Sequence, residues 1–278
     1  GKEPTKLMVS VGHDSRITAE RIKERVIAAL TAAGVRVLDC GLSSTPAMFM
    51  TTVKLGCDGA VQITASHHPA DRNGLKFFLP EGGLDSSDIA EILAAAEGSE
   101  KAPESCGSVE KIDFMTEYSA ILRKLICDEL GVKEEDKPLS KYHIVVDAGN
   151  GAGGFYADKV LEPLGADISG SIYLEPDGMF PNHIPNPENA VAMASISDAV
   201  INSNADLGVI FDTDVDRAGC VDPDGVEINR NRLVALAAAI ALEKEPGSTV
   251  VTDSVTSAGL KEFIEDVLGG KHHRFKRG

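Results

Sequence analysis

Three aspartates alternate along a short segment that directly follows an apolar run. Asp212, Asp214 and Asp216 stand in the stretch "VIFDTDVDRAG". Three carboxylates at this spacing repel one another unless a cation lies between them, and hard oxygen ligands favour Mg²⁺ or Ca²⁺. An EF-hand calcium loop is excluded, because its sixth position needs Gly and its twelfth needs Glu, where this segment has Arg217 and Pro223. The segment predicts a metal-binding loop, with an acidic surface turn as the alternative.

A second polar cluster, "TASHHP" at residues 64–69, follows the apolar run "GAVQI". Serine and proline together are typical of a turn, so Ser66 taken alone indicates no more than that. His67 and His68 have no Cys or HExxH partner at metal spacing, so a zinc site is not indicated. For His67, a hydrogen bond to phosphate and a role in shaping the loop both stay open.

Basic side chains accompany both clusters. Arg217 follows the aspartates at once, where it could hold phosphate oxygens with a bidentate fork or pair with one of the same aspartates. "GHDSR" near the N-terminus has the same pattern: Gly12 is expected to turn the backbone tightly, and Arg16 follows, although Asp14 could be only a helix N-cap. Lys76 in "NGLK" could exchange a proton if its surroundings shift its pKa.

The elements that carry these clusters alternate along the chain. Short β-branched runs at 7–11, 35–40 and 58–63 alternate with helical patterns at 18–34 and 45–56, which predicts parallel strands joined by crossover helices. The clusters then follow the carboxyl ends of strands, the edge of an open α/β sheet where ligand sites gather.

Similar strand-loop-helix openings recur farther along, at "IVVDAGNG" and at "TVVTDSVTS". They suggest divergent copies of one α/β domain. We expect a loop at 98–111 and a domain linker at 133–141, because both stretches are polar and contain proline. "DAGNGAGG" lacks the lysine of a P-loop and is expected to form a structural turn.

Composition limits the function further. The chain has 278 residues, 43% of them hydrophobic, which is enough for about two domains with cores of their own. Its formal net charge of −16 disfavours nonspecific binding to nucleic acid or an anionic membrane. Five scattered cysteines suit a reducing compartment, and neither a signal peptide nor a membrane span is indicated. We expect a cytoplasmic protein, or one in an organelle after loss of a transit peptide.

Taken together, "GHDSR", "TASHHP", "NGLK" and "DTDVDR", in this order along the chain, resemble the α-D-phosphohexomutases, the phosphoglucomutase and phosphomannomutase superfamily. The resemblance implies repeated α/β/α domains with mixed, mostly parallel sheets, of which the chain would hold two and the start of a third. It also implies an intramolecular phosphotransferase that moves phosphate between O1 and O6 of glucose or mannose phosphates through glucose 1,6-bisphosphate or its mannose counterpart.

The same resemblance implies roles for individual residues. Ser66 would be the phosphoserine and, with the three aspartates of "DTDVDR", would bind Mg²⁺. Lys76 would be the general acid/base, Arg16 would steady the phosphoryl group together with Arg217, and His67 would act at the catalytic serine. Arg217 and Lys276 would bind the phosphate and the substrate.

By this resemblance the expected domains are 1–137 with the phosphoserine loop, 138–228 with the metal loop, and 229–278 as the first part of a third. The chain is accordingly expected to be a fragment that lacks the sugar-specificity loop and a fourth, phosphate-binding domain. Two other functions stay open: a haloacid-dehalogenase-type phosphatase with Asp212 as nucleophile and Asp214 as acid, and a sugar-phosphate-binding protein without activity.

Overall fold

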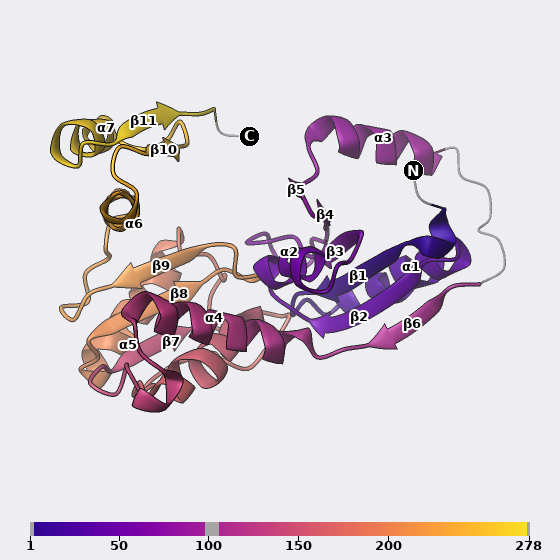
Figure 1. Cartoon of the computed structure of the whole chain (residues 1–278). Coiled ribbons are helices and arrows are strands. Elements are labelled where there is room, and N and C mark those ends of the chain that lie inside the picture. Colours follow the sequence, from indigo (N-terminus) through magenta and orange to yellow (C-terminus); the bar gives the residue numbers. More distant parts are fainter. Residues whose placement is uncertain (1–2, 98–105, 277–278) are drawn as a thin grey trace. The chain divides into compact units, whose positions relative to one another are not determined.

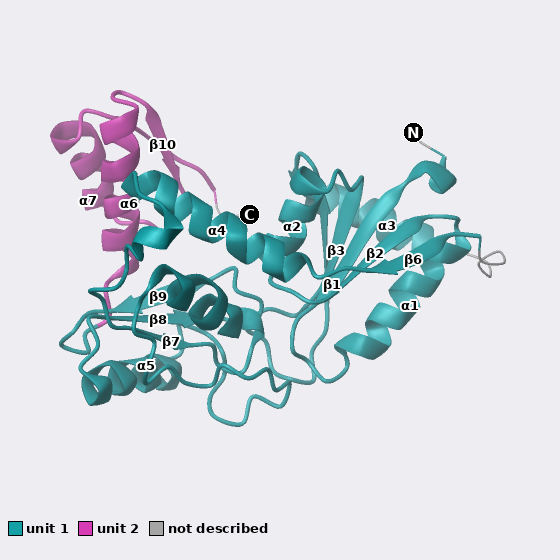
Figure 2. Ribbon diagram, turned by 60° about the horizontal axis from the view of Figure 1, so that its bottom comes forward, with its two compact units in different colours: residues 1–226 teal, residues 227–278 magenta. Residues whose placement is uncertain are grey.

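The protein folds into two compact units, residues 1–226 and residues 227–278 (Figures 1 and 2). The structure is a computed structural model that describes residues 3–97 and 106–276. Several hydrophobic clusters stabilise the larger unit, and the smaller unit has one of its own.

A six-stranded sheet with the order β5-β4-β3-β1-β2-β6 forms the first half of the larger unit. Its strands are β1 (Met8–His13), β2 (Arg36–Leu42), β3 (Gly59–Ile63), β4 (Leu75–Leu79), β5 (Gly82–Gly83) and β6 (Ser108–Lys111). β1 runs parallel to β2 and β3, and β2 runs parallel to β6, whereas β4 is antiparallel to both β3 and β5. The expected mixed, mostly parallel sheet is thus confirmed.

Helices cover both faces of this sheet. Helix α1 (Ala19–Ala32) packs on the face to which β3 turns Val61 and Ile63, and α2 (Thr45–Lys54) packs on the opposite face with Ala60. Successive strand residues point to opposite faces, so the apolar run of β3 supplies both layers. Helix α4 (Phe114–Leu130) joins α2 in its layer, which completes an α/β/α arrangement.

The helix ends follow local chemistry. Ser44 accepts a hydrogen bond from the backbone N–H of Ala47 at the start of α2, and Pro46 stands in the first turn. Asp113 caps α4, which ends at Gly131 in the left-handed conformation. Helix α3 (Ser86–Glu97) buries none of its side chains.

The second half of the larger unit is a smaller α/β/α arrangement, in which a three-stranded sheet is covered on both faces. Its three strands are β7 (Ile144–Asp147), β8 (Leu207–Phe211) and β9 (Ala218–Val221), with β7 parallel and β9 antiparallel to β8. Helix α5 (Ala190–Ser203) covers one face, and the π-helical turn η4 (Tyr156–Leu161) covers the other.

The smaller unit has a parallel pair of strands and three helical segments. Its elements are α6 (Arg230–Lys244), β10 (Thr249–Thr252), α7 (Ala258–Glu262), the π-helical η6 (Phe263–Val267) and β11 (Lys271–Arg274). Helix α6 packs on α7 and η6 through Ala238, Leu242, Leu260 and Ile264. The division into 1–137, 138–228 and 229–278 stays a prediction.

Two local predictions were wrong. Part of the expected loop 98–111 forms β6 at Ser108–Lys111, while residues 98–105 lie outside the described residues. All four side chains of β6 are exposed at the sheet edge, so the sequence has no apolar alternation there. Gly12 lies inside β1 instead of at a turn. A Cβ at this position would lie 2.5 Å from Sδ of Met48, so close packing requires the glycine.

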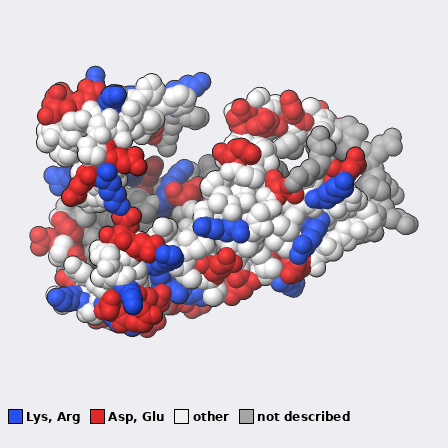
Figure 3. All heavy atoms as spheres, in the orientation of Figure 1, with Lys and Arg blue, Asp and Glu red and all other residues white. Residues whose placement is uncertain are grey.

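Charged side chains are distributed over the surface. Figure 3 shows many Asp and Glu groups on the visible face, with Lys and Arg side chains as separate groups among them. This distribution agrees with a net charge of −16. Within the described ranges, no helix combines the length and the apolar character needed to cross a membrane.

Candidate active site

The polar clusters meet at one edge of the six-stranded sheet. β1, β2 and β3 run parallel, so the segments that follow them emerge at the same side. β4 is antiparallel to β3 and begins there, which brings Lys76 opposite Gln62 at the end of β3. The β8–β9 hairpin, which carries the three aspartates, lies against this edge: the backbone N–H of Thr45, after β2, donates to the carbonyl of Asp214 at 2.8 Å.

Ser66 lies in a closed loop between β3 and β4. The backbone N–H of Thr64 donates to the carbonyl of Gly74, which closes the loop at its base. The hydroxyl of Thr64 accepts from the backbone N–H of Ser66 at 2.9 Å, and Ser66 has a φ of 50°. A non-glycine residue in this left-handed region is strained by roughly 1–3 kcal/mol, which the surrounding contacts must offset.

The three aspartates lie in the tight hairpin loop between β8 and β9. Phe211 pairs with Ala218 at its base, and Val215 at its tip has a φ of 66°, a strained conformation for a β-branched residue. One carboxylate oxygen from each of Asp212, Asp214 and Asp216 lies within 4.8 Å of the others. The sequence placed these residues together, and the structure brings their oxygens within reach of one ion.

The electrostatics of this cluster fit a bound cation. Burial, together with the charges of Asp214 and Asp216, raises the pKa of Asp212 to about 8. Oδ1 of Asp214 is buried and, within the described part of the chain, has no hydrogen-bond partner. Converging oxygen ligands of this kind suit a hard divalent ion such as Mg²⁺, and its positive charge would stabilise the ionised carboxylates.

Lys76 reaches the same aspartates from β4. Its Nζ donates to Oδ2 of Asp214 and to Oδ2 of Asp216, each at 2.6 Å. Burial acts to lower the pKa of Lys76, but the charges and hydrogen bonds of the two carboxylates outweigh burial, so the pKa is raised. The side chain is therefore an ammonium ion in this arrangement, and it neutralises part of the negative charge of the cluster.

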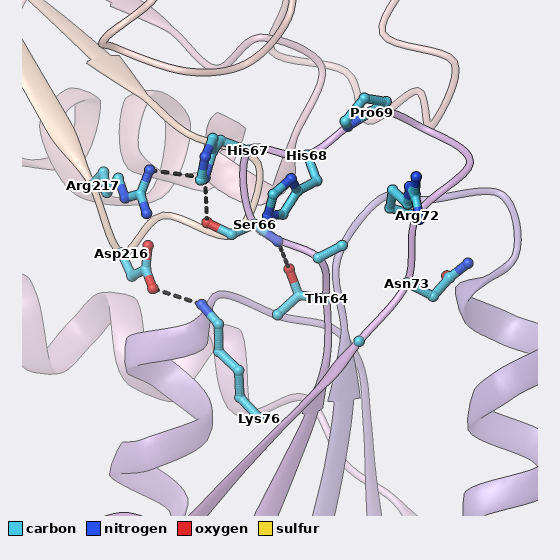
Figure 4. A pocket seen from close by; sticks show the side chains of 12 residues that line it. Thr64, Ser66, His67, His68, Pro69, Arg72, Asn73, Lys76, Asp216 and Arg217 are labelled. Carbon is cyan, nitrogen blue, oxygen red and sulfur yellow. Dashed lines mark hydrogen bonds and ion pairs between the residues drawn. The ribbon is translucent and has the colours of Figure 1, made fainter. Parts of the chain in front are cut away.

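Ser66, His67 and Arg217 form a connected group (Figure 4). The Ser66 hydroxyl donates to Oδ2 of Asp212 at 3.1 Å. Nη1 of Arg217 donates to Nδ1 of His67 at 2.8 Å, so Nδ1 is the unprotonated ring nitrogen and Nε2 carries the hydrogen. Burial and the Arg217 charge lower the pKa of His67, which keeps the ring neutral and leaves it a single N–H donor.

A cavity of about 680 Å³ opens over this group. Its size is in the range of small-molecule sites. The lining residues come from the Ser66 loop, β4 and the metal loop: Thr64, Ala65, Ser66, His67, His68, Pro69, Arg72, Asn73, Gly74, Lys76, Asp216 and Arg217. Figure 4 shows Ser66, Lys76 and Arg217 gathered around the same space. A serine hydroxyl, a lysine, an arginine and an acidic cluster together form a site that could hold a phosphorylated ligand.

Two further residues predicted for the site are Arg16 and Lys276. Arg16 is buried beneath the Ser66 loop, with no exposed side-chain area, and bonds to backbone carbonyls of that loop. Lys276 is exposed in the smaller unit, just after β11. The roles expected for both residues stay predictions.

Sequence reasoning missed Thr45. Its backbone N–H donates to the carbonyl of Asp214, and its hydroxyl donates to the carboxylate Oδ2 of the same residue. The one available signal was its position directly after β2, at the same sheet edge as the other clusters. The segment "DAGNGAGG" at 147–154 also supports the metal loop, because the backbone N–H of Ala152 donates to the carbonyl of Thr213.

Comparison with known proteins identifies the family. Residues 2–103 match the family model described as phosphoglucomutase/phosphomannomutase, alpha/beta/alpha domain I, and residues 120–225 match domain II of the same family. The chain belongs to the α-D-phosphohexomutase superfamily. The two matches include the Ser66 loop and the metal loop respectively.

Individual phosphohexomutases are similar over nearly the whole chain. It is 32% identical over 270 residues to a phosphomannomutase/phosphoglucomutase of Pseudomonas putida, covering 97% of this chain and 56% of that protein. It is 34% identical over 300 residues to a phosphomannomutase of Escherichia coli, covering 96% and 65%. A solved structure of a family protein from Burkholderia thailandensis has a TM-score of 0.85 at 27% identity, covering 98% of this chain and 58% of that one. The chain thus spans between 56% and 65% of the length of these phosphohexomutases.

Proposed function

We propose that this chain carries the phosphoserine loop and the metal loop of a Mg²⁺-dependent phosphohexomutase. The reaction would transfer phosphate reversibly between O1 and O6 of a hexose phosphate, glucose or mannose, through a phosphoserine at Ser66 and a hexose 1,6-bisphosphate. Relatives named phosphomannomutase and phosphoglucomutase support this proposal. Hexose phosphates would be its partners.

One observation carries the proposal: the Ser66 hydroxyl oxygen lies 3.1 Å from a carboxylate oxygen of the three-aspartate cluster, on the rim of a cavity that Lys76 and Arg217 also line. Phosphoryl transfer needs mainly positioning and neutralisation of charge, and these residues supply both. The serine comes from one half of the unit and the aspartates from the other, so the site depends on the fold of both.

Asp212, Asp214, Asp216 and the Ser66 oxygens would hold Mg²⁺. The ion, when bound, would neutralise charge on the phosphoryl oxygens and polarise the phosphorus. Arg217 would bind phosphate oxygens with the N–H groups that do not bond to His67, and His67 would donate from Nε2. The loop residues around Ser66 would keep water away from the phosphoester.

The transfer step would exchange one P–O bond for another. A hexose hydroxyl attacks the phosphorus of phosphoserine, a new P–O bond to the sugar forms, and the P–Oγ bond to Ser66 breaks. The proton lost by the sugar hydroxyl must reach Oγ of Ser66. Lys76 is the proposed carrier: its ammonium, held beside the site by Asp214 and Asp216, would donate a proton to Oγ as the P–Oγ bond breaks, and the resulting amine would take the proton of the sugar hydroxyl. The reverse step with the other phosphate of the bisphosphate regenerates phosphoserine.

Mass spectrometry tests the proposal. The purified chain is incubated with glucose 1,6-bisphosphate and Mg²⁺, and its intact mass and phosphopeptides are measured. We expect one phosphate, on Ser66, which is lost in Ser66→Ala and kept in the control Ser87→Ala, whose serine lies exposed in α3. Phosphate trapped on Asp212 would instead establish a haloacid-dehalogenase-type phosphatase. A chain that binds the bisphosphate without becoming phosphorylated would be a sugar-phosphate-binding protein.

A further inference from the structure

Arg16 bonds to the backbone of the loop that carries Ser66. Nη1 and Nη2 of its guanidinium donate to carbonyl oxygens distributed along that loop: Ser66, His68, Pro69 and Arg72. A short loop of this kind has few hydrogen bonds of its own, so a cation that joins several of its carbonyls restricts the whole segment.

Every N–H group of the Arg16 guanidinium donates a hydrogen bond within the protein. A guanidinium has five N–H groups, and the remaining one, at Nε, donates to Oδ2 of Asp14 at 3.1 Å. The side chains of Arg16 and Asp14 are fully buried. A direct bond from Arg16 to a phosphate in the cavity would therefore break at least one of these five bonds.

Asp14 holds the arginine from below. It also accepts a hydrogen bond from the backbone N–H of Arg16, at 3.0 Å. The backbone N–H of Asp14 in turn donates to the carbonyl of Ile63, the last residue of β3. The arginine is thus fixed to the end of the strand from which the Ser66 loop departs.

The proline-rich loop 175–189 covers Arg16 from the other half of the unit. The ring of Phe180 lies over the guanidinium, with 5.4 Å between Cζ and the ring centroid. The backbones of the two segments touch, since a Cβ at Gly178 would lie 2.4 Å from the N atom of Ile17. His183 fixes the same loop to β7 through an ion pair with Asp147, at 2.9 Å between Nε2 and Oδ2.

We infer that Arg16 is a positioning residue, clamped by Asp14 and Phe180, that holds the strained Ser66 loop in the geometry for phosphoryl transfer. This inference rests on the proposed function and gives the proline-rich loop a role at a site that it does not line. The positioning role differs from direct binding of phosphate by Arg16. If Arg16 bound phosphate directly, replacing Phe180 would have no effect on transfer.

Two variants test the clamp. Arg16→Lys keeps the positive charge but cannot bond to several carbonyls at once, and Phe180→Leu removes the aromatic face while keeping an apolar side chain. In both we expect slower phosphorylation of Ser66 by glucose 1,6-bisphosphate, by about 10- to 100-fold in Arg16→Lys, the scale on which displacement of a reacting group by about 1 Å acts. The apparent Kd for the bisphosphate should stay within about twofold, because the contacts to the ligand remain.

Matched controls separate the clamp from general destabilisation. Arg36→Lys changes an exposed arginine of β2, and Met179→Leu changes the exposed neighbour of Phe180. Both controls should match the wild type in melting temperature and in transfer rate. The inference would be overturned if either Phe180→Leu or Arg16→Lys phosphorylated Ser66 at the wild-type rate.

Hydrogen exchange provides a readout that does not depend on catalysis. The amides of Thr64, Ser66, His68 and Arg72 are hydrogen-bonded within the loop. We expect these amides to exchange about tenfold faster in Arg16→Lys and Phe180→Leu than in the controls. Unchanged exchange would refute the clamp even if Ser66 is phosphorylated, and faster exchange in a chain that is never phosphorylated would refute the proposed function alone.

Discussion

The Ser66 hydroxyl lies 3.1 Å from Oδ2 of Asp212, a residue 146 positions farther along the chain. The serine follows a strand of the six-stranded sheet and the aspartate follows a strand of the three-stranded sheet. Phosphate on this serine would carry its charge into a cluster of carboxylates, which requires a cation between them.

Divalent cations should bind to and stabilise the chain. Addition of Mg²⁺ or Mn²⁺ is expected to raise the melting temperature, and EDTA should reverse the rise, because the ion binds the folded state. Asp214→Asn is expected to weaken Mn²⁺ binding, measured by titration calorimetry, by about 100-fold or more, since a buried ligand charge is lost. The control Asp85→Asn alters an aspartate at the start of α3. Equal Mn²⁺ affinity in Asp214→Asn and wild type would count against the site.

Thr45 should tune metal affinity without touching the ion. Thr45→Val removes the hydroxyl that donates to Asp214 and is expected to weaken Mn²⁺ binding by about 10- to 100-fold, the usual effect of losing a ligand's hydrogen-bond partner. Thr45→Ser keeps a hydroxyl and should retain most of the affinity. Thr52→Val serves as the control, because it removes a hydroxyl of the same helix that donates to the carbonyl of Phe49. Identical affinities for the valine and serine variants at position 45 would disprove this role.

The backbone at position 66 should favour glycine over alanine. Ser66 has a φ of 50°, which strains any residue with a Cβ. Ser66→Gly is therefore expected to be more stable to urea than Ser66→Ala by about 1 kcal/mol, although both lack the hydroxyl. If alanine proves as stable as glycine, the loop is not strained.

His183 should make stability depend on pH. Burial acts to lower the pKa of His183, but the hydrogen bond and charge of Asp147 outweigh it, so the pKa is raised above its ordinary value of 6.5. Nδ1 and Nε2 face the carbonyl of Ile184 and the Asp147 carboxylate, both acceptors, which favours the imidazolium. The ring also meets Tyr173 edge to face.

The contribution of His183 to the free energy of unfolding is complete below about pH 6.5 and is lost as the pH rises through the higher folded-state pKa. Urea unfolding from pH 5.5 to 9 should show this fall in the wild type, and the fall should be smaller in His183→Gln. His143→Gln, which changes a half-buried histidine just before β7, should keep the wild-type slope. Parallel pH profiles for His183→Gln and the wild type would contradict this prediction.

Much of the fold was predictable because its signals are local. Helix α2 begins at the Ser-Thr-Pro segment and α1 ends just before Gly34, as capping rules require. β6 was missed because an exposed edge strand has no apolar pattern, and only its pairing with β2 defines it. Gly12 was predicted to lie in a turn, but it lies in a strand. The close approach of the Met48 side chain requires a glycine there, and that approach depends on how α2 packs on the sheet.

The sequence by itself determined the chemistry: alternate carboxylates after an apolar strand, a serine loop at a strand end and a lysine on the next strand are patterns of residue type and spacing. Only the tertiary structure decided which groups share a bond. Thr45 reaches Asp214, and Phe180 covers Arg16, across more than a hundred intervening residues. Such contacts depend on how two sheets pack together, and hydrogen bonds act over about 3 Å, a scale that strand and helix periodicity does not specify.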